Sequence, residues 1–349
     1  MAKLSVADKM AQKAFFNPQF QQSWQVHMKA FGPILEPAFR ENYQAKVHLC
    51  AALNHISTKN IPQALLKLKQ MDKHCVTDAD KTAMLFFMGL FCEAAGNQEQ
   101  MIALYAKANE SGHRFYLPYM KVAKYSLDTH DYGTAEENYR AAIRCFDATG
   151  LGKQDRLLLG SAYTNLASCL TMMHRYEEAE EALETSRSLY PDAPGRAAVE
   201  ATLFAVRGDA EQANARLEAL KAFSAEAYAL VRKGVDKILA GTDPMFFTVP
   251  VEEEKITAFW SWFQNQSSDM KQKLDRQEYA AVIDPVARKL LETFPFLEEV
   301  PYVGLGKNEK GYVLELKDLY AVGIIDAYEK LLTACPEAVK EHWQFAVVH

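Results

Sequence analysis

The sequence predicts a mostly α-helical chain in which a solenoid of about five stacked helix pairs precedes a small α+β domain. Amphipathic helical patterns recur in pairs, at a nearly constant spacing, between residues 43 and 241. That rhythm ends near Pro244, and short alternating segments typical of strands follow. Self-similarity at a fixed period is the signature of repeat proteins, in which one supersecondary unit stacks on the next.

The clearest copy of the repeat runs from Ser161 to Pro191. An amphipathic helix leads through a short turn at His174 and Arg175 into a second helix, and a proline closes the unit. The unit resembles the tetratricopeptide repeat (TPR), whose aromatic, large-small, close-contact and closing-proline positions are matched by Tyr163, Leu166-Ala167, Ala179 and Pro191. The resemblance implies a TPR-like right-handed α-solenoid, in which each helix pair buries its apolar face on its neighbours.

The same frame fits five stretches of the chain. A small residue that lets paired helices approach closely recurs in the first helix at Ala52, Gly89, Ala123, Ala167 and Ala201. Twelve residues later the second helix has Ala64, Met101, Ala135, Ala179 and Ala213. Large side chains follow at Leu68, Tyr105, Tyr139, Leu183 and Leu217. Only Met101 departs from the small-residue rule, so we expect the second pair to be slightly splayed or repacked.

Spacing and turn chemistry support this frame. Successive first-helix positions lie 37, 34, 44 and 34 residues apart, against an ideal TPR repeat of about 34. The ten surplus residues fall around Thr149–Lys153, where two glycines indicate a loop. Turn-forming residues join the paired helices at Lys59-Asn60, Gly96-Asn97, His130-Asp131 and Gly208-Asp209.

Three domains follow from the pattern. Residues 1–42 are helical in pattern but out of frame, and we expect them to cap the first repeat or to fill the groove of the solenoid. Residues 43–241 form the solenoid, closed by a helix over Ala225–Ala240 that Gly241 stops. Residues 244–349 form the C-terminal α+β domain. The chain stops at His349, directly after an apparent strand, which leaves open whether the natural protein continues.

In the C-terminal domain the sequence predicts the order ααββαβ, with helices packed on a small antiparallel sheet. The expected helices and strands are Pro250–Phe263, Asp275–Thr293, Val300–Leu305, Gly311–Lys317, Leu319–Ala334 and Trp343–Val348.

Charge and composition restrict the function. The net charge of −6 and pI near 5.9 argue against nucleic acid or an anionic membrane surface as a partner. No stretch reaches the roughly 20 apolar residues of a membrane helix, and the first residues do not form a secretory signal. We therefore expect a cytoplasmic protein, and its six cysteines, without a C-x-x-C pair, to be free thiols.

No pattern typical of catalysis is present. The P-loop, G-x-G-x-x-G, G-x-S-x-G and H-E-x-x-H motifs are all absent. His48 and His55 are seven residues apart and could share a helix face, but no third ligand follows at a suitable spacing. We expect no catalytic residues, no metal site and no cofactor, so the chain is predicted not to be an enzyme.

The TPR resemblance implies a concave groove lined by the first helix of each pair. Carried onto this sequence, it predicts a binding groove lined by Lys46, Leu49, Leu53, Phe86, Leu90, Met120, Lys124 and Leu127. Apolar side chains left in water forgo about 1.5–3 kcal/mol each, so a covering segment is expected. The cover is either a partner peptide or helix, or the aromatic segment 10–35 of this chain.

The leading hypothesis is a protein–protein interaction scaffold or adaptor that binds a peptide or helix in the concave groove. One alternative is a ligand- or peptide-sensing regulator whose N-terminal segment leaves the groove on binding. Another is an enzyme with an unrecognised site in the C-terminal domain. The sequence identifies neither the partner nor the oligomeric state.

Overall fold

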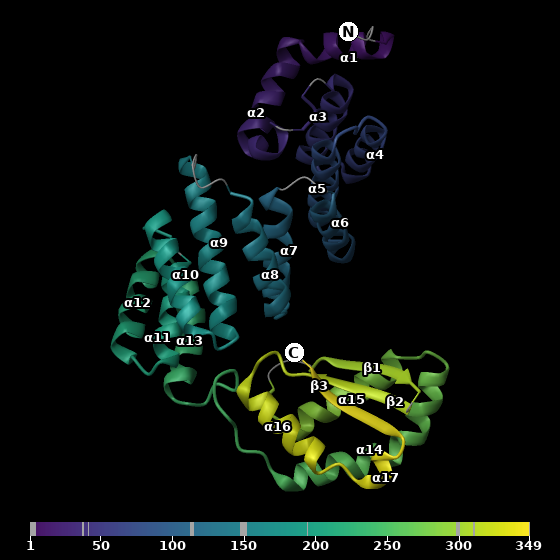
Figure 1. The fold of residues 1–349 in the computed structure, drawn as a ribbon, viewed down its shortest axis with the longest axis vertical. Coiled ribbons are helices and arrows are strands. Elements are labelled where there is room, and N and C mark those ends of the chain that lie inside the picture. Colours follow the sequence, from purple (N-terminus) through teal and green to yellow (C-terminus); the bar gives the residue numbers. More distant parts are fainter. Residues whose placement is uncertain are drawn as a thin grey trace. The chain divides into compact units, whose positions relative to one another are not determined.

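A computed structural model describes residues 5–36, 38–40, 42–111, 115–146, 152–193, 195–297, 301–309 and 311–348. These residues form 17 helices and three strands (Figure 1). The chain divides into two compact units, Met1–Leu166 and Ala167–His349, whose boundary falls inside helix α9 (Lys153–Met172). The predicted domain boundaries at residues 42/43 and 241/244 stay predictions.

Unit 1 consists of two N-terminal helices, three helix pairs and the first part of α9. Its helices are α1 (Val6–Phe15), α2 (Pro18–Leu35), α3 (Tyr43–Ser57), α4 (Ile61–Asp72), α5 (Asp78–Ala94), α6 (Gln98–Glu110), α7 (Tyr116–Asp128) and α8 (Tyr132–Arg144). Within each pair the helices pack along their length, as α3 with α4, α5 with α6 and α7 with α8.

Unit 2 contains the rest of α9, four further repeat helices and the C-terminal domain. The repeat helices are α10 (Tyr176–Leu189), α11 (Arg196–Val206), α12 (Ala210–Phe223) and α13 (Ala225–Leu239). The C-terminal elements are α14 (Glu253–Asp275), α15 (Ala280–Thr293), β1 (Val303–Asn308), β2 (Gly311–Lys317), α16 (Val322–Thr333), α17 (Glu337–Lys340) and β3 (Trp343–Val348).

The predicted repeat register is confirmed by burial. All eight alanines assigned to close helix contacts are 0% exposed, namely Ala52, Ala64, Ala123, Ala135, Ala167, Ala179, Ala201 and Ala213. The large side chains assigned to the next packing position are buried as well. A methyl group at these places lets two backbones approach, and the neighbouring large side chain fills the remaining space.

The turn inside each pair has a common construction. The residue after the C-cap of the first helix has a left-handed backbone, with φ between 59° and 77° at Lys59, Gly96, His130, His174 and Gly208. The next residue is the N-cap of the second helix. In four of the five pairs it is Asn or Asp, whose side chain accepts a hydrogen bond from a backbone N–H of the first turn, at Asn60, Asn97, Asp131 and Asp209. Left-handed helix ends followed by N-caps explain why these residue types recur.

The second pair is repacked, as the methionine in its second helix predicts. A Cβ atom added to Gly89 of α5 would lie 2.6 Å from Cε1 of Tyr105. The tyrosine ring therefore occupies the space that an alanine methyl would take, while Met101 is buried beside it on α6. A glycine on one helix accommodates larger side chains on the other.

The C-terminal sheet has the strand order β1-β2-β3. β1 and β2 form the predicted antiparallel hairpin, whereas β3 runs parallel to β2, with Leu314 opposite Phe345. The expectation of a purely antiparallel sheet is thus wrong. Helices α16 and α17 connect β2 to β3 and return the chain to the end where β2 began, and such a crossover makes the paired strands parallel.

Two predicted helix boundaries in this domain also differ. The helix expected from Leu319 begins at Val322, because Leu319 and Tyr320 have left-handed φ angles of 52° and 61°. The helix expected over Asp275–Thr293 is α15 alone, since α14 continues to Asp275 and a turn with Gln277 at φ 62° separates the two. Both boundaries fall at left-handed backbone turns, which the hydrophobic periodicity does not record.

Replacing Gly89 by alanine tests the repacked pair. We expect the free energy of unfolding to fall by about 1–3 kcal/mol, because the new methyl overlaps a buried ring. Chemical denaturation of the full chain measures the loss. The matched control is Gly195→Ala, where an added Cβ meets nothing within 4 Å. Equal stability of the two variants would contradict the close contact.

Candidate functional site

The predicted groove residues lie on α3, α5 and α7, the first helices of the three pairs in unit 1. We call the surface that they define the first-helix face. Leu49, Leu53 and Phe86 are buried. The remaining positions are more open: Lys46, Leu90, Met120 and Leu127 are half-buried and Lys124 is exposed.

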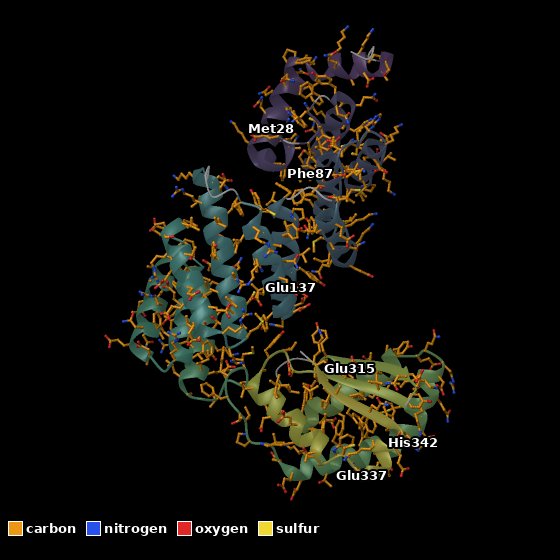
Figure 2. The ribbon with its side chains drawn as sticks, viewed as in Figure 1. Met28, Phe87, Glu137, Glu315, Glu337 and His342 are labelled. Carbon is orange, nitrogen blue, oxygen red and sulfur yellow. The ribbon has the colours of Figure 1, made fainter. Side chains whose placement is uncertain are left out.

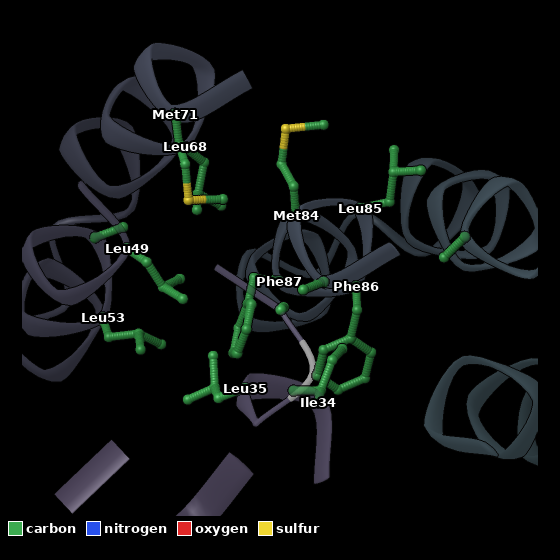
Figure 3. Packing of buried hydrophobic residues seen from close by; sticks show 14 of the residues in the cluster. Ile34, Leu35, Leu49, Leu53, Leu68, Met71, Met84, Leu85, Phe86 and Phe87 are labelled. Carbon is green, nitrogen blue, oxygen red and sulfur yellow. The ribbon is translucent and has the colours of Figure 1, made fainter. Parts of the chain in front are cut away.

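Helix α2 lies against the buried part of this face. Ile34 and Leu35 of α2 belong to the same apolar cluster as Leu49, Leu53 and Phe86, and Figure 3 shows them on facing sides of one core. The rings of Phe31 and Phe87 meet edge to face, with centroids 5.1 Å apart. In Figure 2, Met28 and Phe87 mark the two helices concerned. The cluster is closed by this chain's own helix.

Aromatic rings extend this contact to α1. The ring of Phe15 lies 5.8 Å from that of Trp24 and 5.3 Å from that of Tyr43, centroid to centroid. Lys46 Nζ lies 5.0 Å from the centroid of the Phe15 ring and donates a hydrogen bond of 2.7 Å to the carbonyl of Arg40. Burial lowers the pKa of Lys46. This lysine is engaged by the N-terminal helices and does not stand open in the groove.

A buried carboxylate, which the sequence argument missed, holds the chain that follows α2. Asp80 accepts hydrogen bonds from the backbone N–H groups of Phe39 at 2.6 Å, Val76 at 3.1 Å and Thr77 at 3.2 Å. Phe39 has a φ of 56°, unusual for a bulky residue. The sequence signal was available, because Thr77 and Asp80 form a capping box at the start of α5.

The open part of the first-helix face is an apolar strip bordered by ion pairs. Leu90 and Met120 pack against the edge of the core and stay half-buried. Lys121 Nζ lies 2.9 and 2.7 Å from the two carboxylate oxygens of Glu93, and the Tyr105 hydroxyl donates to Glu93 Oε2 at 3.1 Å. Burial, followed by the nearby Glu93 charge, raises the pKa of Tyr105, so its hydroxyl remains a donor.

A second ion pair lies further along α7, where Lys124 donates to Asp128. Met120, Lys124 and Leu127 follow at helical spacings of four and three residues, so they share one side of α7. This side of α7 thus combines two apolar side chains with a paired charge.

Three histidines lie near the junction of the N-terminal helices with the first pair. The rings of His48 and His74 stack with centroids 5.7 Å apart. His27 Nε2 is buried with no hydrogen-bond partner within the described part of the chain. Burial is the largest cause that lowers the pKa of each of these three imidazoles. All three are therefore more easily kept neutral than a histidine in water.

The cysteine thiols of this chain are buried or half-buried. All six cysteines are free, and burial raises the pKa of Cys75 to about 12 and of Cys335 to about 11. Such thiols are protonated at neutral pH and are poor nucleophiles. Across the residues that the structure describes, no group of three or more His, Cys, Asp or Glu side chains could hold a metal ion.

Two of the surface hollows in the described chain lie at the N-terminal helices and in the C-terminal domain. One, of about 430 Å³, lies in unit 1 and is lined by Ala14, Asn17, Gln19, Phe20, Ser23 and Asn54. The other, of about 630 Å³, lies between α14 and α16 and is lined by Val251, Glu253, Ile256, Thr257, Asp326, Glu329, Lys330, Thr333 and Ala334. In the second hollow the Lys330 ammonium is 2.7 Å from the Asp326 carboxylate, so this cation is already neutralised.

Among the described helices, none has the length and apolar character needed to cross a lipid bilayer.

The stacked helix pairs, with their common turn and buried alanines, make this chain a TPR-like helical-repeat protein with a small α/β part at its C-terminus. No protein-family model and no curated protein matches the sequence.

Several solved structures are distantly similar. MamA from AMB-1 is 14% identical with a TM-score of 0.37, over 54% of this chain and 92% of that one. The C-terminal part of a TPR repeat-containing protein from Cytophaga hutchinsonii is 14% identical with a TM-score of 0.39, over 83% and 96%. Aspartyl phosphate phosphatase F from Bacillus subtilis is 14% identical with a TM-score of 0.40, over 91% and 75%. The fold assignment rests on this chain's own helix pairs.

Replacing Asp80 by asparagine tests the carboxylate that holds Phe39. An amide offers one acceptor oxygen in place of two, so at least one of the three N–H groups loses its charged partner and stability falls by about 2–3 kcal/mol. Denaturant unfolding measures the difference. Asp78→Asn, an exposed site on the same helix turn, serves as the control and should change little. An Asp80→Asn variant as stable as the wild type would show that the hydrogen bonds accepted by Asp80 contribute nothing to stability.

Acid should destabilise unit 1. A histidine whose folded pKa lies below its ordinary value of 6.5 binds fewer protons folded than unfolded, so its stability contribution is complete above that pH and falls as the pH drops below it. We expect denaturation midpoints measured at about pH 7.5 and 5.5 to differ more in the wild type than in His27→Leu. Equal losses in both chains would exclude His27 as a source of the acid sensitivity.

Proposed function

We propose that this chain is a cytoplasmic interaction scaffold, not an enzyme, that binds a segment of another protein on the concave first-helix face. One observation carries the proposal: the same face already accepts a helix, because α2 packs Phe31, Ile34 and Leu35 against it. A surface that buries an apolar helix from its own chain has the shape and chemistry to bind another. In this proposal residues 1–42 cover one end of a solenoid formed by residues 43–241, and residues 244–349 form the appended domain.

The preferred partner follows from what α2 presents. Phe31 lies at the break of α2, and Ile34 and Leu35 follow it three and four residues later, so the three apolar side chains stand close together in the sequence. The groove beside them continues with Leu90, Met120 and Leu127. A partner helix with an aromatic and two aliphatic side chains at that spacing would extend this contact, and its flanking charges would meet Lys121, Glu93, Lys124 and Asp128.

The open residues, and not the buried ones, are the places to test binding. Phe86 is buried beneath α2, so a charge at that position would unfold the first two pairs instead of reporting on a partner. Met120 is half-buried at the surface of α7. A photoreactive amino acid in its place reports directly on what contacts the face.

We expect the full chain carrying a benzophenone amino acid at position 120 to form covalent adducts with a protein in a cell extract. The yield should fall at least fivefold in the presence of Leu90→Glu, which places a charge in the apolar strip. Adducts are measured by gel shift and mass spectrometry. The control position is Glu137, exposed on α8, the second helix of its pair (Figure 2). Equal yields from positions 120 and 137, or yields that ignore Leu90→Glu, would contradict the proposal.

A second candidate is a regulator in which the beginning of the N-terminal segment withdraws when a ligand binds. The observation that favours it is a break in α2, where Phe31 has non-helical angles of φ −129° and ψ 22°. Before the break lies His27, whose buried Nε2 atom has no hydrogen-bond partner among the described residues. After the break, the Phe39 N–H donates a hydrogen bond to the Asp80 carboxylate. Ligand-induced protease cleavage between residues 5 and 30, with residues 31–40 still protected, would distinguish this regulator from a static scaffold.

A further inference from the structure

The segment that leaves the last repeat helix packs, half-buried, against the apolar cluster at the end of the solenoid. Phe246 and Phe247 lie against the apolar cluster of α11, α12 and α13, which includes Leu217 and Val235. The segment 243–247 is also folded on itself, since Asp243 accepts hydrogen bonds through its backbone carbonyl from the N–H groups of Phe246 and Phe247 at 3.1 and 3.0 Å. A flexible tether would not bury two aromatic side chains.

The same segment caps a helix of the C-terminal domain. α16 has no side-chain N-cap. Its first backbone donors are satisfied instead by the segment's carbonyls: the N–H of Val322 donates to Met245 at 3.2 Å and that of Gly323 donates to Pro244 at 2.8 Å. A Cβ atom at Gly323 would lie 2.6 Å from the carbonyl oxygen of Phe247, so only glycine fits this approach. The first backbone N–H groups of α16 are thus hydrogen-bonded to the segment that follows the last repeat helix.

A third connection comes from a different repeat. His174, in the turn between α9 and α10, lies with its Nε2 atom 2.6 Å from the carbonyl oxygen of Tyr320. Its Nδ1 atom is 2.8 Å from the Tyr176 hydroxyl, and its ring meets that of Phe246 edge to face at 5.6 Å. Because a carbonyl oxygen only accepts, Nε2 carries the proton, and Nδ1 accepts from the tyrosine hydroxyl.

The carbonyl that His174 binds is presented by a strained turn. Leu319 and Tyr320 are consecutive non-glycine residues with left-handed backbones, a conformation that persists only where surrounding contacts enforce it. Those contacts are present: the buried Asp318 accepts a hydrogen bond from the Tyr320 N–H at 2.9 Å, and its own N–H donates to Val348 of β3 at 3.0 Å. Strand β3, the turn at Asp318–Tyr320 and the repeat turn at His174 are therefore connected by consecutive hydrogen bonds.

We infer that segment 243–247, the beginning of α16 and His174 form a fixed joint that makes the C-terminal domain the structural cap of the solenoid. The end of an array of repeats exposes an apolar face that needs a cover, and here Phe246 and Phe247 supply it while the carbonyls of Pro244 and Met245 hold α16. The last repeats and the C-terminal domain unfold together, and a ligand bound to either one changes the stability of the other. This inference is independent of what the first-helix face of unit 1 binds.

Hydrogen exchange of the full chain, followed by mass spectrometry, tests the joint from both sides. His174→Asn keeps a residue that tolerates the left-handed turn but cannot reach Tyr320. We expect it to accelerate exchange roughly fivefold to tenfold in β2 and α16, although the substitution lies in a repeat. Gly323→Ala, which lies in the C-terminal domain, should accelerate exchange in α12 and α13. The matched control, Gly195→Ala, has open space around its added methyl and should change neither region.

The joint would be excluded if His174→Asn accelerated exchange only in the repeat helices and Gly323→Ala accelerated it only in the C-terminal domain. It would also be excluded by unfolding of the wild-type chain in two separate steps, with α11–α13 and α14–α16 losing protection at different denaturant concentrations. If Gly323→Ala does not fold, the His174→Asn comparison decides alone, because that substitution removes the hydrogen bonds and ring contact of His174 and introduces no overlap.

Discussion

The close approach of two helix backbones at a repeated alanine is the contact on which the rest of this structure depends. With a methyl group at each contact, one pair can bury its large side chains on the next, and the left-handed turn with its Asn or Asp cap fixes the angle at which the pair closes. Where the rule is broken, at Met101, glycine at position 89 restores the space for Tyr105. Stability in such an array comes mainly from neighbouring interfaces, so each local contact supports the whole.

The two ends of the repeat array are closed by different chemistry. At the N-terminal end, aromatic and aliphatic side chains of α1 and α2 cover the first-helix face, and the Asp80 carboxylate secures the chain behind them. At the C-terminal end, two phenylalanines cover the last repeats while backbone carbonyls cap α16. Caps of this kind remove apolar surface from water, whereas Leu90 and Met120, in the middle of the first-helix face, stay half-buried.

The charged side chains around the open strip are engaged within the chain itself. The ionisable groups near the open strip are already paired, as Glu93 with Lys121 and Lys124 with Asp128, and the thiols of Cys75 and Cys335 are held protonated by burial. Paired surface charges give specificity and steer association more than they add affinity. Affinity on such a face has to come from apolar contact.

The sequence by itself determined the helix pairs, their register and their turns, because these depend on local features: alanine at a fixed spacing, a residue that tolerates a left-handed backbone, and an Asn or Asp directly after it. Only the tertiary structure decided which groove residues are covered, since Leu49 and Phe86 look like lining residues until α2 packs on them. The tertiary structure also decided the parallel pairing of β3, the late start of α16 and the hydrogen bond of His174 to Tyr320. Each joins segments far apart in the chain, and no periodicity in the sequence records such a contact.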